Sequence, residues 1–123
     1  MDTISDRLNQ IMMAKNAGKK VFEMYSSKFL IKIFEIMKQN GYINYKAKED
    51  KFPKIIVETK SLNECGSIRP RFYVKKEELE RYIRRFLPAR GFGIIIISTS
   101  KGLMTHTEAL EKGIGGCLIA YCF

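Results

Sequence analysis

Four consecutive isoleucines, Ile94–Ile97, constrain the fold more than any other part of the sequence. Isoleucine is branched at Cβ and favours extended backbone, so the run predicts a β-strand over residues 94–99. Successive side chains of a strand point to opposite faces, so a strand without polar residues is buried on both faces. The chain therefore needs further elements to cover this strand. No apolar run approaches the ~20 residues of a membrane-spanning helix, so no membrane segment is predicted.

The first half of the chain alternates helical and extended patterns. Residues 3–16 are predicted to form a helix, because Thr3 can cap it and apolar residues recur at helical spacing. A second helix is predicted from Ser26 and Ser27, with Asn40–Gly41 at its end. Together with three strands, these helices give the order α-β-α-β-β. The strands are expected over residues 20–25, 42–48 and 54–60.

The second half is predicted to follow the order β-α-β-α-β. Thr105 and Glu108 have the spacing of a capping box, which predicts a short helix that ends at Gly113. The other elements are a strand around 69–75, a helix over 76–86, the isoleucine strand, and a strand over 117–122. The sequence thus predicts an α/β (α+β) fold of two small packed domains. Their expected bounds are residues 1–64 and 65–123.

The net charge is the second constraint. The chain has 22 basic and 13 acidic residues, a formal charge of +9, spread evenly along the sequence. Residues 1–64 carry 12 basic and 8 acidic side chains, and residues 65–123 carry 10 and 5. An even excess of this kind suits a folded surface with distributed phosphate contacts, rather than a disordered basic tail.

Signatures of an enzyme or of a metal protein are missing from the sequence. The only histidine, His106, has no partner at ligand spacing and is expected to be a solvated residue in the first turn of a helix. Gly113–Gly116 follows a helix rather than opening one, so it does not match a dinucleotide-binding loop. The three cysteines are expected to be reduced, buried thiols of an intracellular protein. No cofactor, metal or small-molecule substrate is predicted.

Ser98–Gly102 is the most informative stretch, because three hydroxyls and a lysine follow a buried strand. Such clusters often bond their own backbone in turns, but short hydroxyls also bind phosphates, 2′-hydroxyls and base edges of RNA. The turn at Gly113–Gly116 is either a helix cap or a place where a ligand approaches the main chain. Ser26–Lys28 at a helix start is either an ordinary cap or a phosphate site.

These blocks, in this order and spacing, resemble the small-subunit ribosomal protein S8 family. The C-terminal match is highly specific, because Ser98–Thr105, Glu108–Ala109 and Gly113–Gly116 agree at nearly fixed spacing. The N-terminal region and a central block that contains Arg71 and Tyr73 are similar too, so the resemblance covers essentially the whole chain. It implies two small α/β domains without catalytic activity. It also implies binding to the central domain of small-subunit rRNA, at an irregular stem with an internal loop, and support of subunit assembly.

By position, the resemblance assigns RNA contacts to both halves. The serine–threonine loop and the glycine turn would hold the internal loop, and residues at two helix starts would contact the RNA backbone. Neighbouring small-subunit ribosomal proteins are the other expected partners. The RNA-binding residues implied are Thr3, Ser27, Lys28, Arg71, Tyr73, Ser98, Thr99, Ser100, Lys101, Gly102, Gly115 and Gly116.

Departures from the family pattern, together with the composition, indicate the kind of ribosome in which the protein works. The segment Glu80–Arg90 is longer than typical, and its Arg81, Arg84 and Arg85 are predicted to face RNA or a neighbouring protein, or to form a solvated basic face. Heavy use of Ile, Lys, Asn, Phe and Tyr is typical of an AT-rich genome. The N-terminus also has no targeting pattern. We therefore expect an organelle-encoded mitochondrial protein, with a plastid or the bacterial cytoplasm as alternatives.

Three functional classes follow from these observations. The first is a structural rRNA-binding protein of the small ribosomal subunit. The second is a free regulatory RNA-binding protein that acts on a messenger stem, which sedimentation would separate from the first. The third, a small enzyme, is disfavoured because the sequence holds no catalytic set.

Overall fold

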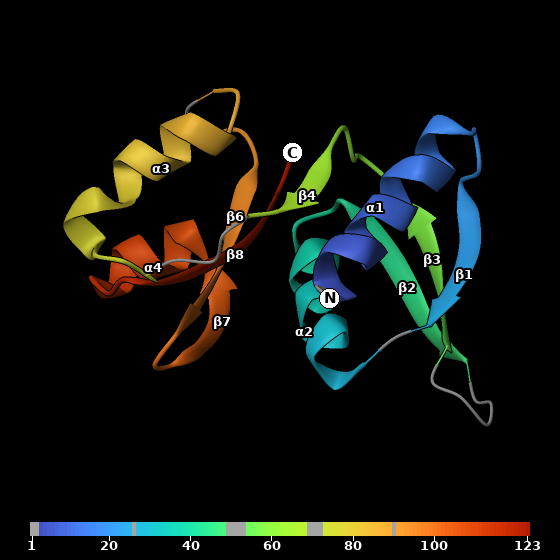
Figure 1. The fold of residues 1–123 in the computed structure, drawn as a ribbon, viewed down its shortest axis with the longest axis horizontal. Helices are drawn as coiled ribbons and strands as arrows, with labels where there is room; N and C mark the ends of the chain where they lie inside the picture. Colours follow the sequence, from blue (N-terminus) through green and yellow to red (C-terminus); the bar gives the residue numbers. More distant parts are fainter. Residues whose placement is uncertain (1–2, 26, 49–53, 69–72, 90) are drawn as a thin grey trace. The chain divides into compact units, whose positions relative to one another are not determined.

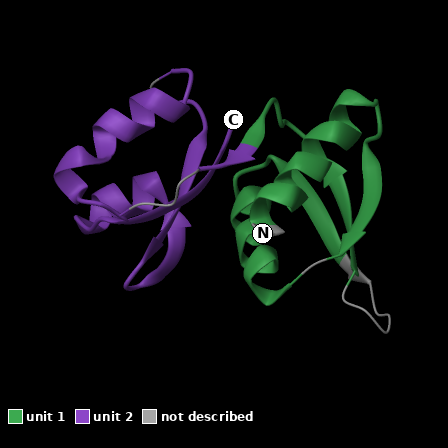
Figure 2. Cartoon of the chain, viewed as in Figure 1, with its two compact units in different colours: residues 1–65 green, residues 66–123 purple. Residues whose placement is uncertain are grey.

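The computed structural model describes residues 3–25, 27–48, 54–68, 73–89 and 91–123. The chain divides into two compact units, Met1–Cys65 (unit 1) and Gly66–Phe123 (unit 2), which Figure 2 shows in different colours. Both units combine helices with an antiparallel sheet, so the α+β class predicted from the sequence is confirmed.

Unit 1 has the predicted order helix–strand–helix–strand–strand. β3 lies between β1 and β2 in its sheet and pairs with both in antiparallel fashion. Thr3, predicted to cap the first helix, is instead the first helical residue, and the residue before it lies outside the described ranges. The elements are α1 (Thr3–Asn16), β1 (Val21–Tyr25), α2 (Lys28–Gln39), β2 (Ile43–Lys48) and β3 (Lys54–Thr59) (Figure 1).

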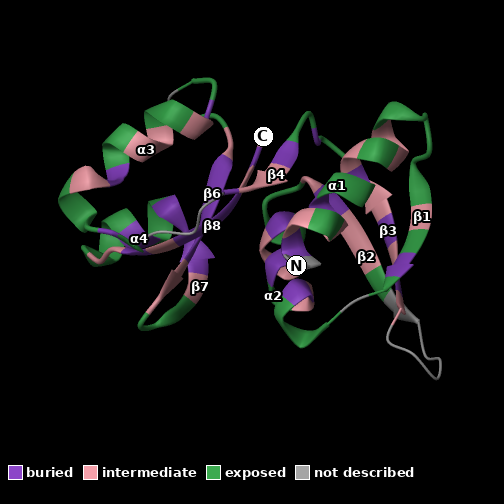
Figure 3. Cartoon of the chain, in the orientation of Figure 1, coloured by how far each residue is buried: buried purple, intermediate pink, exposed green. Residues whose placement is uncertain are grey.

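The core of unit 1 forms where helical and strand periodicities meet. Apolar residues of α1 and α2 recur every three or four positions, which places them on one face of each helix. In β3, Ile55 and Val57 are buried, whereas the residues beside them are half-buried. Figure 3 shows the buried positions as stripes on the helices and strands. The buried helical residues are Ile4, Leu8 and Ile11 of α1, and Leu30, Ile33, Phe34 and Met37 of α2.

The second sheet contains two strands that the sequence pattern did not predict, β7 and β4, and β4 begins at Cys65, the last residue of unit 1. The expected strand around 69–75 is present as the short β5, and residues 69–72 lie outside the described ranges. Both unpredicted strands are short and lack a clear alternation of apolar and polar residues. The elements are β4 (Cys65–Ser67), β5 (Tyr73–Val74), the 3-10 turn η1 (Lys76–Glu78), α3 (Leu79–Phe86), β6 (Ile94–Thr99), β7 (Gly102–Thr105), α4 (His106–Lys112) and β8 (Gly116–Cys122).

The isoleucine strand β6 lies between β8 and β7 in the sheet of unit 2. The strand order is β4-β8-β6-β7, and β5 also pairs with β8. All four isoleucines are at most 6% exposed, so the strand is buried on both faces. Ile95 and Ile97 belong to one core cluster with residues of α3, α4 and β8, such as Leu79, Ala109 and Leu118. Because its interior is fixed in this way, the ends of β6 have defined positions.

Candidate nucleic-acid interface

The hairpin between β6 and β7 holds the serine–threonine loop in place. Thr99 pairs with Gly102 at the end of the ladder, and Gly102 has a φ of 107°, which favours glycine. The Thr99 hydroxyl donates to the Gly102 carbonyl (2.9 Å) and accepts from the Lys101 N–H (3.1 Å). Thr99 therefore stabilises its own turn, while Ser100 and Lys101 are exposed at its tip.

The glycine turn packs against the end of this hairpin so closely that a side chain does not fit there. Gly113 caps α4 in the left-handed conformation, with a φ of 64°. A Cβ on Gly116 would stand 2.5 Å from the Ser98 carbonyl oxygen, and one on Gly115 would collide with the Val74 carbonyl oxygen. The need for glycine at 115 and 116 is thus explained by the protein's own packing, which brings the loop before β8 beside the end of β6.

The two loops and the start of η1 enclose an open cleft of about 390 Å³, here named the hydroxyl cleft. Two of its hydroxyls, those of Ser98 and Ser100, have no side-chain hydrogen bond among the described residues. Tyr73 is 70% exposed at the cleft and presents its ring to solvent. The lining residues are Tyr73, Lys75, Lys76, Glu77, Ser98, Thr99, Ser100, Gly113, Ile114 and Gly115.

The cleft thus combines three kinds of group that suit RNA. Free hydroxyls donate and accept hydrogen bonds, an exposed aromatic ring offers a stacking surface, and lysines attract phosphate. Of the residues named from the sequence, Tyr73, Ser98, Thr99, Ser100 and Gly115 line it. Lys101 and Gly102 lie in the adjoining turn, and the buried Gly116 lies behind it.

Five residues that line the hydroxyl cleft are not among the RNA contacts named from the sequence: Lys75, Lys76, Glu77, Gly113 and Ile114. Lys75 and Lys76 are exposed and follow Tyr73 closely, so a basic pair next to an aromatic residue was an available signal. Gly113 and Ile114 belong to the Gly113–Gly116 turn that the sequence singled out, but only its last two glycines were named as RNA contacts. Their place in the cleft follows from the C-terminal cap of α4.

The remaining predicted contacts belong to unit 1 or fall outside the described residues. Ser27 is the N-cap of α2, and its hydroxyl accepts from the Leu30 N–H (3.3 Å). Lys28 is the first residue of that helix and is exposed. Thr3 begins α1, and Arg71 lies outside the described residues. The structure therefore brings together the predicted site residues of unit 2 only.

The prediction for His106 was wrong, because the side chain is buried rather than solvated. It is 8% exposed, and its Nδ1 accepts a hydrogen bond from the Ile95 N–H (3.0 Å). Burial lowers the pKa of the imidazole, which holds it in the neutral form. The ring therefore ties α4 to β6. The exposed position expected from the capping box is taken by Thr107 instead.

The cysteines are free thiols, as expected, but they are not all buried. Cys65 and Cys122 are buried, whereas Cys117 is half-buried. Burial raises the pKa of Cys65 to about 12, and its Sγ donates to the Leu8 carbonyl (3.7 Å). Within the described residues, no three His, Cys, Asp or Glu side chains group as metal ligands do.

The comparison with known families agrees with this geometry. No helix in the described part of the chain has the length and apolar character needed to cross a bilayer. The model of the family described as ribosomal protein S8 matches residues 2–123, essentially the whole chain. That family consists of structural RNA-binding proteins rather than enzymes. The chain therefore belongs to the ribosomal protein S8 family and is a small-subunit ribosomal protein that binds ribosomal RNA.

Proposed function

We propose that the hydroxyl cleft binds an irregular stem with an internal loop in the central domain of small-subunit rRNA. The observation that carries this proposal is that Ser98, Ser100 and Tyr73 line one open cleft, and that neither serine hydroxyl is used by the protein's own described residues. A regular duplex offers little to such a cleft, because its bases are stacked and its major groove is deep and narrow. A distorted stem presents unstacked bases and accessible 2′-hydroxyls.

Each group in and beside the cleft has a distinct role in this proposal. Ser98 and Ser100 hydrogen-bond to 2′-hydroxyls or base edges, and the Tyr73 ring stacks on an unpaired base. Lys101, at the exposed tip, contacts phosphate. Gly102, Gly115 and Gly116 act indirectly, because they let the two loops approach closely enough to form the cleft. Thr99 likewise holds the turn that presents the two serines.

Unit 1 adds contacts that are independent of RNA sequence. Lys28 stands in the first turn of α2, where the helix dipole and free N–H groups attract phosphate. Ser27 caps the same helix, and Thr3 begins α1. Such contacts fix position and raise affinity without reading base identity. Arg71 is assigned to the RNA on its resemblance to the family alone.

This binding would make the chain a structural component that supports small-subunit assembly and translation. We place it in a mitochondrial ribosome, because the heavy use of Ile, Lys, Asn, Phe and Tyr points to an AT-rich genome. The same composition is compatible with a plastid or an AT-rich bacterium. Detection of the chain in small subunits purified from mitochondria tests this placement, and its absence there would refute it.

The decisive experiment measures two RNAs against serine variants at one fixed salt concentration. Ser98→Ala and Ser100→Ala each remove a hydroxyl but little volume, so folding should be nearly unaffected. Each is expected to cost roughly 1 to 3 kcal/mol in affinity for the stem with the internal loop, because its RNA partner is left unpaired. A regular duplex of the same length should be bound equally well by the variants and by the unaltered chain.

The matched control is Ser61→Ala, which removes an exposed serine hydroxyl in unit 1, outside the hydroxyl cleft. It should leave the affinity for both RNAs unchanged. If the cleft variants weaken both RNAs equally, the loop contacts phosphate but does not read shape. That result would contradict the proposed role of the cleft.

A further inference from the structure

A second cleft of unit 2 lies between α3 and α4 and is not part of the RNA site. It has a volume of about 510 Å³, and we name it the helix groove. The hydroxyl cleft is lined by residues around the start of η1, at the end of β6 and after α4, whereas the helix groove is lined by residues of α3, of the loop after it and of α4. The two clefts share no lining residue. Their nearest lining residues are three positions apart in the chain, Glu77 and Glu80 on one side and Leu110 and Gly113 on the other.

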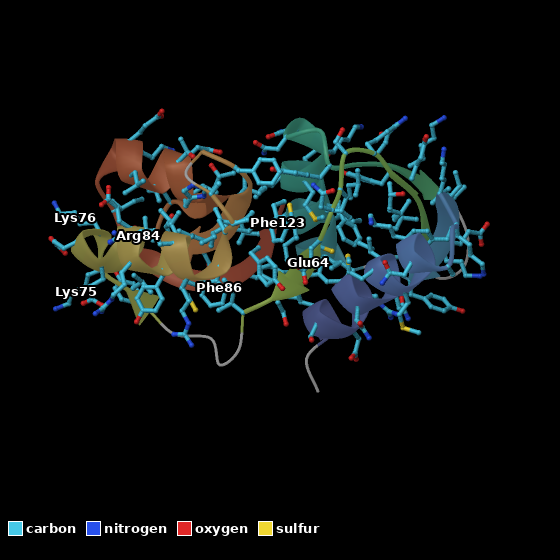
Figure 4. All side chains as sticks on the ribbon, turned by 90° about the horizontal axis from the view of Figure 1, so that it is seen from above. Glu64, Lys75, Lys76, Arg84, Phe86 and Phe123 are labelled. Atoms are coloured by element: carbon cyan, nitrogen blue, oxygen red, sulfur yellow. The ribbon has the colours of Figure 1, made fainter. Side chains whose placement is uncertain are left out.

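Figure 4 shows the two ends of this region. Lys75 and Lys76, which line the hydroxyl cleft, lie at one end of the helical segment, and Phe86 lies toward the other. Arg84 is on the part of α3 that borders the helix groove.

Part of the lining of the helix groove is apolar, and we name this part its apolar floor. Ile83 and Leu87 come from the α3 side, Leu110 comes from α4, and Pro88 belongs to the same set. Leu110 is 41% exposed, although it belongs to a helix whose opposite face enters the core. These side chains gain from burial against other apolar side chains, which an RNA backbone does not supply.

Among the described residues, the rim of the groove carries one cation, Arg84, and one carboxylate, Glu80. Arg84 is exposed and has no ion pair among the described residues. The other two arginines of α3 are engaged outside the groove: Arg81 lies 3.7 Å from the Glu78 carboxylate, and Arg85 lies over the Phe86 ring. The predicted basic face is thus divided, and only Arg84 borders the groove. Glu80, one turn earlier, lines it as well.

The start of α4 adds neutral hydrogen-bonding groups beside this cation. The Thr107 hydroxyl lines the groove, and the His106 Nε2 lies 3.5 Å from it. Because His106 Nδ1 accepts the Ile95 N–H, the proton of the neutral ring is on Nε2. A guanidinium, a hydroxyl and an imidazole N–H beside an apolar floor match a carboxylate flanked by apolar side chains.

We propose that the helix groove binds an acidic, amphipathic segment of a neighbouring small-subunit protein. Its apolar side chains lie on Ile83, Leu87 and Leu110, and its carboxylate pairs with Arg84. The proposal rests on the proposed function, because it requires the chain to be part of an assembled small subunit. RNA is the other anionic partner, but a phosphate backbone would leave the apolar floor uncovered and would have no reason to prefer Arg84 over Arg81.

The test places a photo-crosslinker in the groove of the assembled small subunit. The chain with Leu110→p-benzoylphenylalanine is incorporated into subunits reconstituted with their rRNA and proteins, irradiated, and the crosslinked peptide is identified by mass spectrometry. We expect a protein peptide in which Asp or Glu lies beside apolar residues. The control is Glu111→p-benzoylphenylalanine, at an exposed position of α4 outside the groove, which should give little of this product.

Two arginine variants then test the chemistry of the rim. Arg84→Glu should lower the yield of the protein crosslink about tenfold, because it replaces the pairing cation by a like charge. Arg81→Glu, three residues away and outside the groove, should leave the yield unchanged. An Asp or Glu to Arg change in the identified peptide should restore the crosslink with Arg84→Glu.

The outcomes separate this proposal from the one on which it rests. A crosslink to rRNA, equal losses with both arginine variants, or no crosslink in subunits that contain the chain would each overturn the protein partner while leaving the rRNA-binding function intact. Failure of the unaltered chain to enter small subunits at all would overturn the proposed function, and this proposal with it.

Discussion

The hydroxyl cleft and the helix groove lie in one unit of 58 residues and share no lining residue, and they present different chemistry. The hydroxyl cleft has Lys75 and Lys76 at its edge, and the helix groove has Arg84. The hydroxyl cleft adds serine hydroxyls and close-packed backbone, whereas the groove adds isoleucine, leucine and proline beside Glu80 and Thr107. The difference shows that the +9 charge of the chain does not by itself identify its partners. The surface between the cations decides whether RNA or a protein segment fits.

The way each surface is held also differs. The hydroxyl cleft depends on backbone geometry, with glycines at positions where any side chain collides with a carbonyl oxygen. The helix groove depends on side-chain packing and on one buried imidazole that links α4 to β6. Substitutions should therefore separate the two sites. Three substitutions should do so, with effects that decrease from Gly116→Ala through Thr99→Ala to His106→Gln.

Gly116→Ala should have the largest effect and should break the hydroxyl cleft. The new Cβ would stand 2.5 Å from the Ser98 carbonyl oxygen and 2.6 Å from the Ile97 Cγ2, so β8 and β6 must move apart. We expect a loss of about 3 kcal/mol in the free energy of unfolding, at the upper end for overpacking. Urea denaturation measures it. An unchanged unfolding midpoint would mean that the strands accommodate the methyl group and that glycine is not required there.

Thr99→Ala should have a smaller effect and distinguishes support of the cleft from contact with RNA. The variant loses the hydrogen bonds of the Thr99 hydroxyl to Gly102 and Lys101, at a cost of about 1 kcal/mol in stability. Ser100→Ala, one residue later, should leave stability within about 0.5 kcal/mol. Thermal unfolding of both variants provides the comparison. Equal destabilisation would show that Ser100 also holds the turn.

The smallest effect is a pH dependence located at the groove. Burial lowers the pKa of His106 below 6.5, so the unfolded chain binds a proton more readily than the folded one. Stability from the neutral ring is therefore complete above pH 6.5 and decreases as the pH falls below it. His106→Gln removes this titration. Its loss of stability between about pH 7.5 and about pH 5.5 should be smaller than that of the unaltered chain. Identical losses would refute the buried neutral imidazole.

Much of the fold was predictable because its strongest signals are local. The isoleucine run fixed β6, helical spacing gave α1 and α2, and the capping box at Thr105 and Glu108 located α4. The strands β4 and β7 were not predicted, because three or four residues without clear alternation become strands only when a neighbour completes their hydrogen bonds. His106 was misjudged for a related reason. A capping box tells where a helix begins but not which side of its first turn faces the core.

The sequence by itself determined the fold class, the family, and the hydroxyl and glycine blocks beside the isoleucine strand. These follow from side-chain branching, from spacing and from charge, which act over a few residues. Only the tertiary structure decided that Thr99 supports the turn while Ser98 and Ser100 stay available, and that Arg84 alone of three arginines borders an apolar groove. Both outcomes depend on which segments meet across the sheet and the helix pair. Contacts between residues far apart in the chain are set by packing, and no local pattern encodes them.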